Sequence, residues 1–192
     1  VLAGFIAGLA AWTKNEGLMF AAVLEIARVA AMVRYGNRNA IVPQVLRIAA
    51  GMLPPLAVVA FFKIKFAPPN DLLSRSTHDV IAHATDFGRW IATLEGFIKA
   101  PFLVGGFLIP LALVLAAYWF LVRFNVETRD RLSLGTVAIA LGLMVLGDFA
   151  VYVLLTADVV WQMNTSMERL FLQLWPSAVL AFFLALNPPQ LM

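Results

Sequence analysis

The sequence of 192 residues contains no cysteine and has few charged side chains. The absence of cysteine excludes disulfides and thiolate-based metal sites. Charged residues make up 13% of the chain and hydrophobic residues 62%, whereas soluble domains contain about 25% charged residues. The mean hydropathy is +0.87. This composition predicts an integral, multi-pass membrane protein.

Two further absences narrow the possible functions. The chain has neither a Gly-x-Gly-x-x-Gly fingerprint nor a P-loop, so no nucleotide-binding motif is present. The net charge of +3 is small and does not indicate a nucleic-acid partner.

Apolar runs separated by polar stretches are the main pattern of the chain. The runs cover residues 1–12, 17–33, 41–62, 101–122, 132–156 and 170–186. They predict an all-α, polytopic transmembrane helical bundle of about six spans, which forms a single transmembrane domain over residues 1–192.

The first run is short, because a spanning helix needs roughly 20 residues and this run has only about 12. No initiator Met, charged n-region or signal peptide precedes it. We therefore expect a fragment that is cut within a helix, with further residues upstream of Val1.

Local features within the runs predict helix contacts. Gly4 and Gly8 have the Gly-x-x-x-Gly spacing that permits close helix packing in membranes. Glu25 and Arg28 lie three residues apart, so they can pair on one face of a helix. Prolines interrupt several of the later runs and predict kinks.

One long polar segment, residues 63–100, separates the third and fourth runs. Apolar residues recur at helical spacing over 80–98 and predict an amphipathic helix of about four turns. Ser76 and Asp79 are spaced as a capping box before it. We expect this helix to lie at the membrane surface or over the mouth of a cavity. Trp90 within it fits an interfacial aromatic belt better than sugar stacking.

The distribution of basic residues predicts which side of the membrane each loop faces. Two groups of turns contain most of the arginines, namely Arg28, Arg34, Arg38, Arg47, Arg123, Arg129 and Arg131. By the positive-inside rule these turns face the cytoplasm. Residues 13–17, 63–100 and 157–169 then share the outer face, so 63–100 is predicted to be an outer-face loop with an amphipathic helix.

Two segments resemble a known family. Gly8–Gly17 is similar to the "GLA-x-x-TK-x-EG" helix–turn–helix of GT-C glycosyltransferases, which are polytopic enzymes that include protein O-mannosyltransferases and aminoarabinose transferases. Asn164–Leu170, followed by Gln173–Pro176, resembles the last outer loop and following helix of bacterial members. The two segments bracket most of the chain.

The resemblance implies a hexosyltransferase of the bacterial inner membrane and cell envelope. Such an enzyme transfers a sugar from a polyprenyl-phosphate-linked donor to an acceptor glycan, lipid or protein on the outer, periplasmic or lumenal, face. The family's catalytic base is an acidic residue in the first outer loop, and no matching loop is found here. We therefore assign no catalytic residue in this chain, expect the base upstream of Val1, and expect residues 1–192 alone to be inactive.

The chemistry of such a reaction selects candidate binding residues. A leaving lipid phosphate needs cationic donors in a dry site, and an acceptor hydroxyl needs a carboxylate. The candidates are Lys14, Glu16, Arg75, His78, His83, Arg89, Asp148 and Arg169.

Each candidate near the outer turns has an ordinary structural alternative. Lys14 either contacts phosphate or a partner carboxylate, or it snorkels at a helix end. Glu16 pairs with Lys14 or holds a cation, or it complements the dipole of the second helix. Arg169 either binds phosphate or forms a salt bridge with Glu168 or Asp158.

The long outer segment contains four of the candidates. The resemblance implies that a mobile outer loop lies at this place and contacts the lipid phosphate, but no individual residue of that loop can be matched to this chain. The alternative is a structural or solvated role for each of the four residues, Arg75, His78, His83 and Arg89. The two histidines are five residues apart, which suits two ligands on one helix face poorly. No metal ligands are assigned, although a divalent metal stays open as a cofactor.

Asp148, an acid within an apolar run, is a functional candidate or a satisfied partner of a hydroxyl or arginine in the bundle. It also fits a rival function, a transporter or flippase of a lipid-linked or polar substrate, which interrupted helices would suit. A repeat relating the two halves would favour a transporter, and none is visible. A membrane scaffold subunit is a third option, and it would need no converging polar groups.

Overall fold

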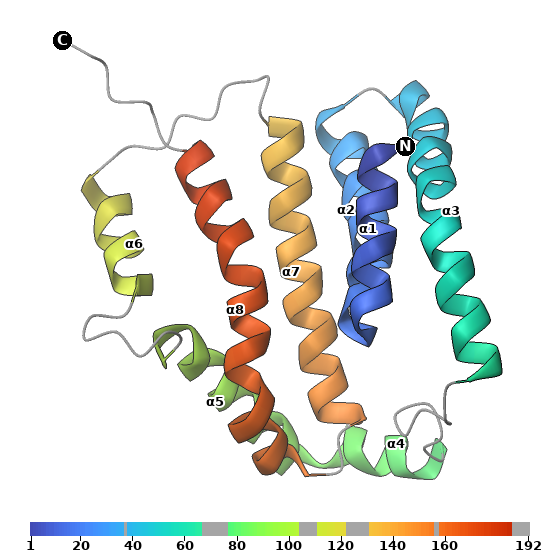
Figure 1. The fold of residues 1–192 in the computed structure, drawn as a ribbon. Helices are drawn as coiled ribbons and strands as arrows, with labels where there is room; N and C mark the ends of the chain where they lie inside the picture. Colours follow the sequence, from blue (N-terminus) through green and yellow to red (C-terminus); the bar gives the residue numbers. More distant parts are fainter. Residues whose placement is uncertain (37, 67–76, 104–110, 122–130, 156–157, 186–192) are drawn as a thin grey trace. The chain divides into compact units, whose positions relative to one another are not determined.

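All elements of the described structure are helical, which confirms the predicted all-α class. In these ranges there are eight α-helices, one short 3-10 helix and no strand (Figure 1). The computed structural model describes residues 1–36, 38–66, 77–103, 111–121, 131–155 and 158–185.

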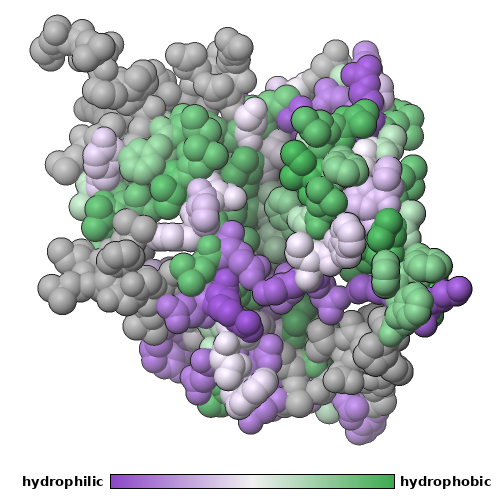
Figure 2. Space-filling model, viewed as in Figure 1, coloured by the Kyte–Doolittle hydropathy of each residue, from purple (hydrophilic) through white to green (hydrophobic). Residues whose placement is uncertain are grey.

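Within the described ranges, three helical segments are long and apolar enough to cross a membrane. They are Arg38–Lys65, Arg131–Leu154 and Val159–Ala185. Many large hydrophobic side chains are exposed on the molecule (Figure 2), as expected for helices that face lipid. The chain therefore has the character of a membrane protein, and the finer prediction of about six spans is not confirmed.

The chain divides into two compact units. The first unit is Val1–Leu73 with Arg129–Val145, and the second is Ser74–Thr128 with Leu146–Met192. The prediction of a single transmembrane domain over residues 1–192 stays a prediction.

The first unit is built around the short apolar helix α1 (Leu2–Thr13). This helix packs against α2 (Asn15–Tyr35) and α3 (Ile41–Lys65), which is preceded by the 3-10 helix η1 (Arg38–Ala40) (Figure 1). The first part of α7 (Arg131–Leu154) also belongs to this unit. Its core consists mostly of small side chains, which let the helices approach closely; the buried cluster is Ala7, Ala11, Ala21 and Met52.

Glycines form the contact between α1 and α3, as the Gly-x-x-x-Gly spacing predicts. A Cβ atom on Gly4 would overlap the carbonyl oxygen of Ile48, and one on Gly8 would overlap the ring of Pro55. From the other side, Gly51 of α3 lies against the backbone at the start of α1. At Gly4 and Gly51 the two backbones therefore touch directly, and at Gly8 the ring of Pro55 packs against the backbone of α1.

The predicted pair of Glu25 and Arg28 is wrong. Arg28 instead donates a hydrogen bond from Nη2 to Oε1 of Gln44 on α3, at 2.9 Å. Both carboxylate oxygens of Glu25 are buried and have no hydrogen-bond partner in the described part of the chain. The long guanidinium side chain reaches across to a neighbouring helix, which a count of residues along α2 cannot show.

In the second unit, the predicted single amphipathic helix over 80–98 is two helices, α4 (Thr77–Thr85) and α5 (Phe87–Leu103). They are separated at Asp86, whose Oδ1 accepts hydrogen bonds from the backbone N–H groups of Gly88 at 3.0 Å and Arg89 at 3.4 Å. Asp86 therefore caps the N-terminus of α5. Ser76, half of the predicted capping box, lies outside the described residues.

The helix α8 (Val159–Ala185) corrects a second prediction, because residues 157–168 were expected to form a polar connection. Oδ1 of Asp158 accepts a hydrogen bond from the backbone N–H of Trp161 at 3.0 Å and caps this helix. The polar residues that follow are its first turns. The second unit also contains α6 (Leu111–Leu121) and the end of α7.

Aromatic side chains join α5, α7 and α8 in the second unit. The ring of Phe97 lies 5.4 Å from Phe149, 5.6 Å from Tyr152 and 5.6 Å from Phe171, between ring centroids. The hydroxyls of Tyr152 and Ser166 are 2.7 Å apart and share a hydrogen bond. These contacts fix the relative placement of α5 and α8, between which the candidate site lies.

Candidate functional site

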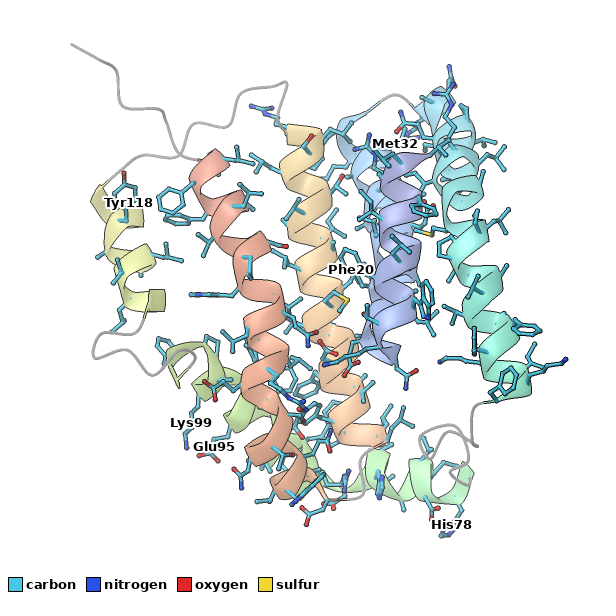
Figure 3. The ribbon with its side chains drawn as sticks, in the orientation of Figure 1. Phe20, Met32, His78, Glu95, Lys99 and Tyr118 are labelled. Carbon is cyan, nitrogen blue, oxygen red and sulfur yellow. The ribbon has the colours of Figure 1, made fainter. Side chains whose placement is uncertain are left out.

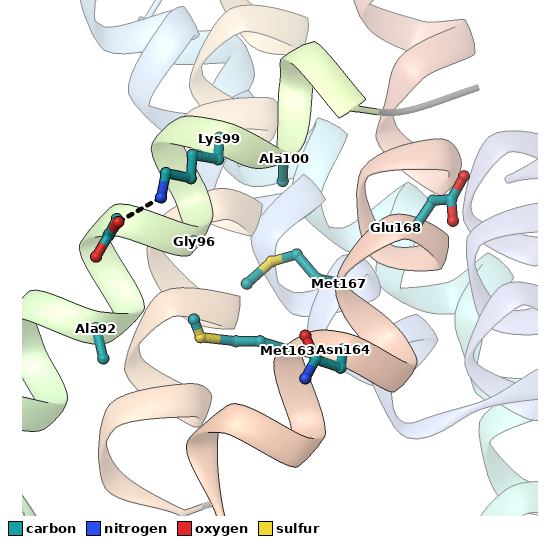
Figure 4. Close-up of a pocket in the computed structure, with 9 residues that line it drawn as sticks. Ala92, Gly96, Lys99, Ala100, Met163, Asn164, Met167 and Glu168 are labelled. Atoms are coloured by element: carbon teal, nitrogen blue, oxygen red, sulfur yellow. Dashed lines mark hydrogen bonds and ion pairs between the residues drawn. The ribbon is translucent and has the colours of Figure 1, made fainter. Parts of the chain in front are cut away.

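A groove of about 440 Å³ lies between α5 and α8 in the second unit (Figure 4). The residues in each wall recur at helical spacing, so a single face of each helix lines the groove. The lining residues are Ala92, Glu95, Gly96, Lys99 and Ala100 from α5, and Met163, Asn164, Met167 and Glu168 from α8.

The floor of the groove is apolar. Met163 and Met167 project from α8 toward α5 (Figure 4), where they meet Gly96. A Cβ atom on Gly96 would overlap Cε of Met163. Small residues on α5 thus make room for two flexible thioether side chains, which adapt readily to different apolar ligands.

The rim of the groove is polar. Lys99 and Glu95, one turn apart on α5, form a hydrogen-bonded ion pair (Figures 3 and 4). The hydrogen bond from Lys99 and then its positive charge lower the pKa of the Glu95 carboxyl below its ordinary value. With Asn164 and Glu168 opposite, the rim offers two carboxylates, one amide and one ammonium group.

The pKa of Glu95 is expected to rise toward its ordinary value in Lys99→Met, since methionine keeps the side-chain length and removes both the hydrogen bond and the charge. An NMR titration of the glutamate side-chain carbonyl carbons would measure this. Lys63→Met is the control, because Lys63 belongs to the first unit and hydrogen-bonds Asn15. An unchanged Glu95 titration in Lys99→Met would contradict the ion pair.

Two predicted phosphate ligands, His83 and Arg89, form hydrogen bonds to the end of α7. Nδ1 of His83 lies 3.0 Å from the carbonyl oxygen of Leu154, so this nitrogen donates the hydrogen bond. Arg89 donates from Nε to the Val153 carbonyl at 3.1 Å and from Nη2 to the Tyr152 carbonyl at 3.3 Å. The last carbonyls of a helix lack partners within it, and the imidazole of His83 and the guanidinium of Arg89 supply donors to them.

Asp148 lies on α7, one turn before Tyr152, and is 4% exposed. It is therefore buried at the same end of α7 that His83 and Arg89 bind. Three of the predicted site residues, His83, Arg89 and Asp148, are thus gathered around one helix end in the second unit.

Lys14 and Glu16 lie at the turn of the first unit and are exposed. Lys14 is the one non-helical residue between α1 and α2, and Glu16 is in the first turn of α2, where a carboxylate complements the helix dipole. Lys63, not predicted as a site residue, brings a second cation here and donates from Nζ to Oδ1 of Asn15 at 2.7 Å. The predicted turn is confirmed.

The remaining candidates do not join these groups. His78 is exposed on α4 (Figure 3), and Arg169 is exposed on α8 and does not line the groove. Arg75 lies outside the described residues. Among the residues that are described, no three His, Asp or Glu side chains come together to hold a metal ion.

Comparisons of the chain with protein-family models, curated proteins and solved structures give no match. The resemblance to GT-C enzymes therefore rests on the two segments themselves. Gly8–Gly17 covers the end of α1, the turn at Lys14 and the start of α2, whereas Asn164–Leu170, which the resemblance places in a loop, is helical in α8.

The groove residues Glu95 and Lys99 were not predicted as site residues. Their spacing of four residues predicts an ion pair on a helix surface, which is common and indicates no site by itself. Met163 and Met167 have the same spacing on α8. Only the packing of α5 on α8 shows that the two faces meet.

Proposed function

We propose that this chain forms part of a GT-C-type membrane glycosyltransferase, a multi-pass protein of the bacterial inner membrane that transfers a sugar from a polyprenyl-phosphate-linked donor to an acceptor on the outer face. The observation that carries the proposal is the groove between α5 and α8. Three of the four residues in its α8 wall, Asn164, Met167 and Glu168, belong to the segment Asn164–Leu170 that resembles the family's last outer loop.

The groove has the chemistry of a site for a sugar or for a hydroxyl-bearing acceptor. Its methionine and alanine floor suits apolar faces and chains, while a few polar groups fix orientation. Asn164 and Glu168 can bind hydroxyls through hydrogen bonds. Because the ammonium of Lys99 is engaged by Glu95, the rim has no free cation for phosphate. Lys14 and Arg169 therefore remain the described candidates for the phosphate.

The course of the helices favours an enzyme over a transporter or flippase. Transporter substrate sites are typically formed by helices that break within the membrane. Here α3 continues through Pro54 and Pro55 as one helix, and α8 continues through Pro176. Within their described ranges, neither helix contains an unwound segment.

The test is an assay of sugar transfer by the full-length protein in liposomes that contain a radiolabelled polyprenyl-phosphate-linked hexose. We expect transfer to acceptor, and we expect Glu168→Gln to lower its rate by about 10-fold, the loss for one hydrogen bond to a charged group. Thr165→Val is the matched control, because the Thr165 hydroxyl donates only within α8, to the carbonyls of Trp161 and Gln162.

Absence of transfer, together with uptake of the substrate into the vesicles, would overturn this proposal in favour of a transporter. Equal loss in Glu168→Gln and Thr165→Val would show that the groove does not hold the substrate.

A further inference from the structure

The helix α5 has two apolar faces, although only one of them packs within the protein. Thr93, Phe97 and Ala100 are buried on one face. A second face carries a stripe at helical spacing, and its side chains are largely exposed: Phe87 74%, Ile91 52%, Leu94 53% and Ile98 59%. A helix in water would not present such a stripe without a partner.

An apolar groove of about 340 Å³ adjoins this stripe. Trp90 forms part of it, with its ring 5.8 Å from that of Phe149 and its Nε1 donating to the carbonyl oxygen of Ala84 at 3.0 Å. No lining residue is charged; they are Ala84, Thr85, Phe87, Trp90, Ile91, Leu94 and Phe149.

The position of α5 relative to α7 and α8 indicates that membrane lipid covers the stripe. In the second unit, Arg89 of α5 binds the carbonyls at the C-terminal end of α7, and Gly96 contacts Met163 near the N-terminal end of α8. Both α7 and α8 are long and apolar enough to span a membrane. The helix α5 therefore crosses the ends of two such helices (Figure 1), and the ends of spanning helices are the parts that leave the hydrocarbon.

The surface next to α5 has the same character. Val160 and Trp161, in the first turn of α8, are each 63% exposed. Tryptophan at the end of an apolar helix is typical of the boundary between lipid and water. The N-terminal turn of α8 therefore also exposes side chains that suit lipid.

We propose that α5 is an interfacial helix whose stripe of Phe87, Ile91, Leu94 and Ile98 faces the acyl chains of membrane lipids. The groove beside Trp90 accommodates a segment of one acyl chain. Glu95 and Lys99, on the flank of the helix, face water and the lipid headgroups. This assignment is independent of the proposed sugar transfer, because it needs only a bilayer.

The absence of cysteine makes a direct test possible, since any single introduced cysteine is the only thiol in the chain. Neighbouring positions on α5 form matched pairs, Leu94→Cys with Glu95→Cys and Ile98→Cys with Lys99→Cys. Each variant is labelled with a nitroxide in the full chain, reconstituted into phosphatidylcholine–phosphatidylglycerol vesicles, and checked for unchanged helix content by circular dichroism.

Electron paramagnetic resonance then compares the accessibility of each label to oxygen, which concentrates in lipid, and to a water-soluble nickel chelate. We expect oxygen to exceed nickel at Leu94 and Ile98, and the order to reverse at Glu95 and Lys99. Equal nickel accessibility within each pair would overturn the proposal, because the stripe would then lie in water. Labels at Leu94 and Ile98 that are immobilised and shielded from both reagents would overturn it in favour of a protein partner.

Discussion

Replacing Gly51 with alanine is expected to lower the free energy of unfolding of the first unit by about 1–3 kcal/mol, the typical cost of overpacking. A Cβ atom at this position would overlap backbone atoms of Val1 and Phe5 at the start of α1. Backbone cannot rotate away as a side chain can, so α1 and α3 must separate. The measurement is the unfolding free energy in bicelles, determined by steric trapping.

Gly142 of α7 provides the matched control, because a Cβ atom there would meet nothing within 4 Å. Alanine is favoured over glycine in a helix by about 1 kcal/mol, so Gly142→Ala is expected to be neutral or stabilising. The two substitutions are chemically identical and differ only in their surroundings. Equal effects would mean that the contact between α1 and α3 does not determine stability.

The helices could be predicted from the sequence because apolar runs bounded by polar residues indicate them directly. The close approach of α1 was also predicted from Gly4 and Gly8. Its partner Gly51 was not, since a single glycine in an apolar run has no spacing that distinguishes it. Which helix receives a Gly-x-x-x-Gly face depends on the tertiary packing.

The helix boundaries were predicted less well, at the break between α4 and α5 and at the start of α8. In both places apolar periodicity does not mark where a helix begins or ends. Apolar periodicity continues across Asp86, so it cannot show the break between α4 and α5, whereas the capping carboxylate can. The polar start of α8 was read as a loop. With 27 residues, α8 is about 40 Å long at 1.5 Å per residue, longer than the roughly 30 Å hydrocarbon core. Its polar turns can therefore lie outside the core and stay helical.

The site predictions selected charged residues and could not foresee backbone partners. His83 and Arg89 were chosen because cations suit phosphate, but their partners are carbonyl groups of Tyr152, Val153 and Leu154. Every residue has a backbone carbonyl, so the sequence does not show which carbonyls lack a hydrogen-bond partner within their own helix. The groove between α5 and α8 was missed for a related reason, since its lining comes from two segments far apart in the chain.

Replacing Arg89 with methionine is expected to lower the stability of the second unit by about 2 kcal/mol, the scale of hydrogen bonds to a charged group. The carbonyl of Val151 accepts the N–H of Leu155 at 2.9 Å, and those of Tyr152 and Val153 accept hydrogen bonds from the guanidinium. Methionine fills similar space and leaves both without this donor. The measurement is again steric trapping in bicelles.

Two further variants make the experiment decisive. Arg169→Met removes an exposed arginine from α8 and is expected to change stability by less than about 0.5 kcal/mol. Arg89→Lys is expected to restore only part of the loss, because an ammonium group lacks the planar fork that reaches two carbonyls together. If Arg89→Met left stability unchanged and abolished binding of a polyprenyl phosphate, Arg89 would be a phosphate ligand, and the capping of α7 would have to be attributed to His83 alone.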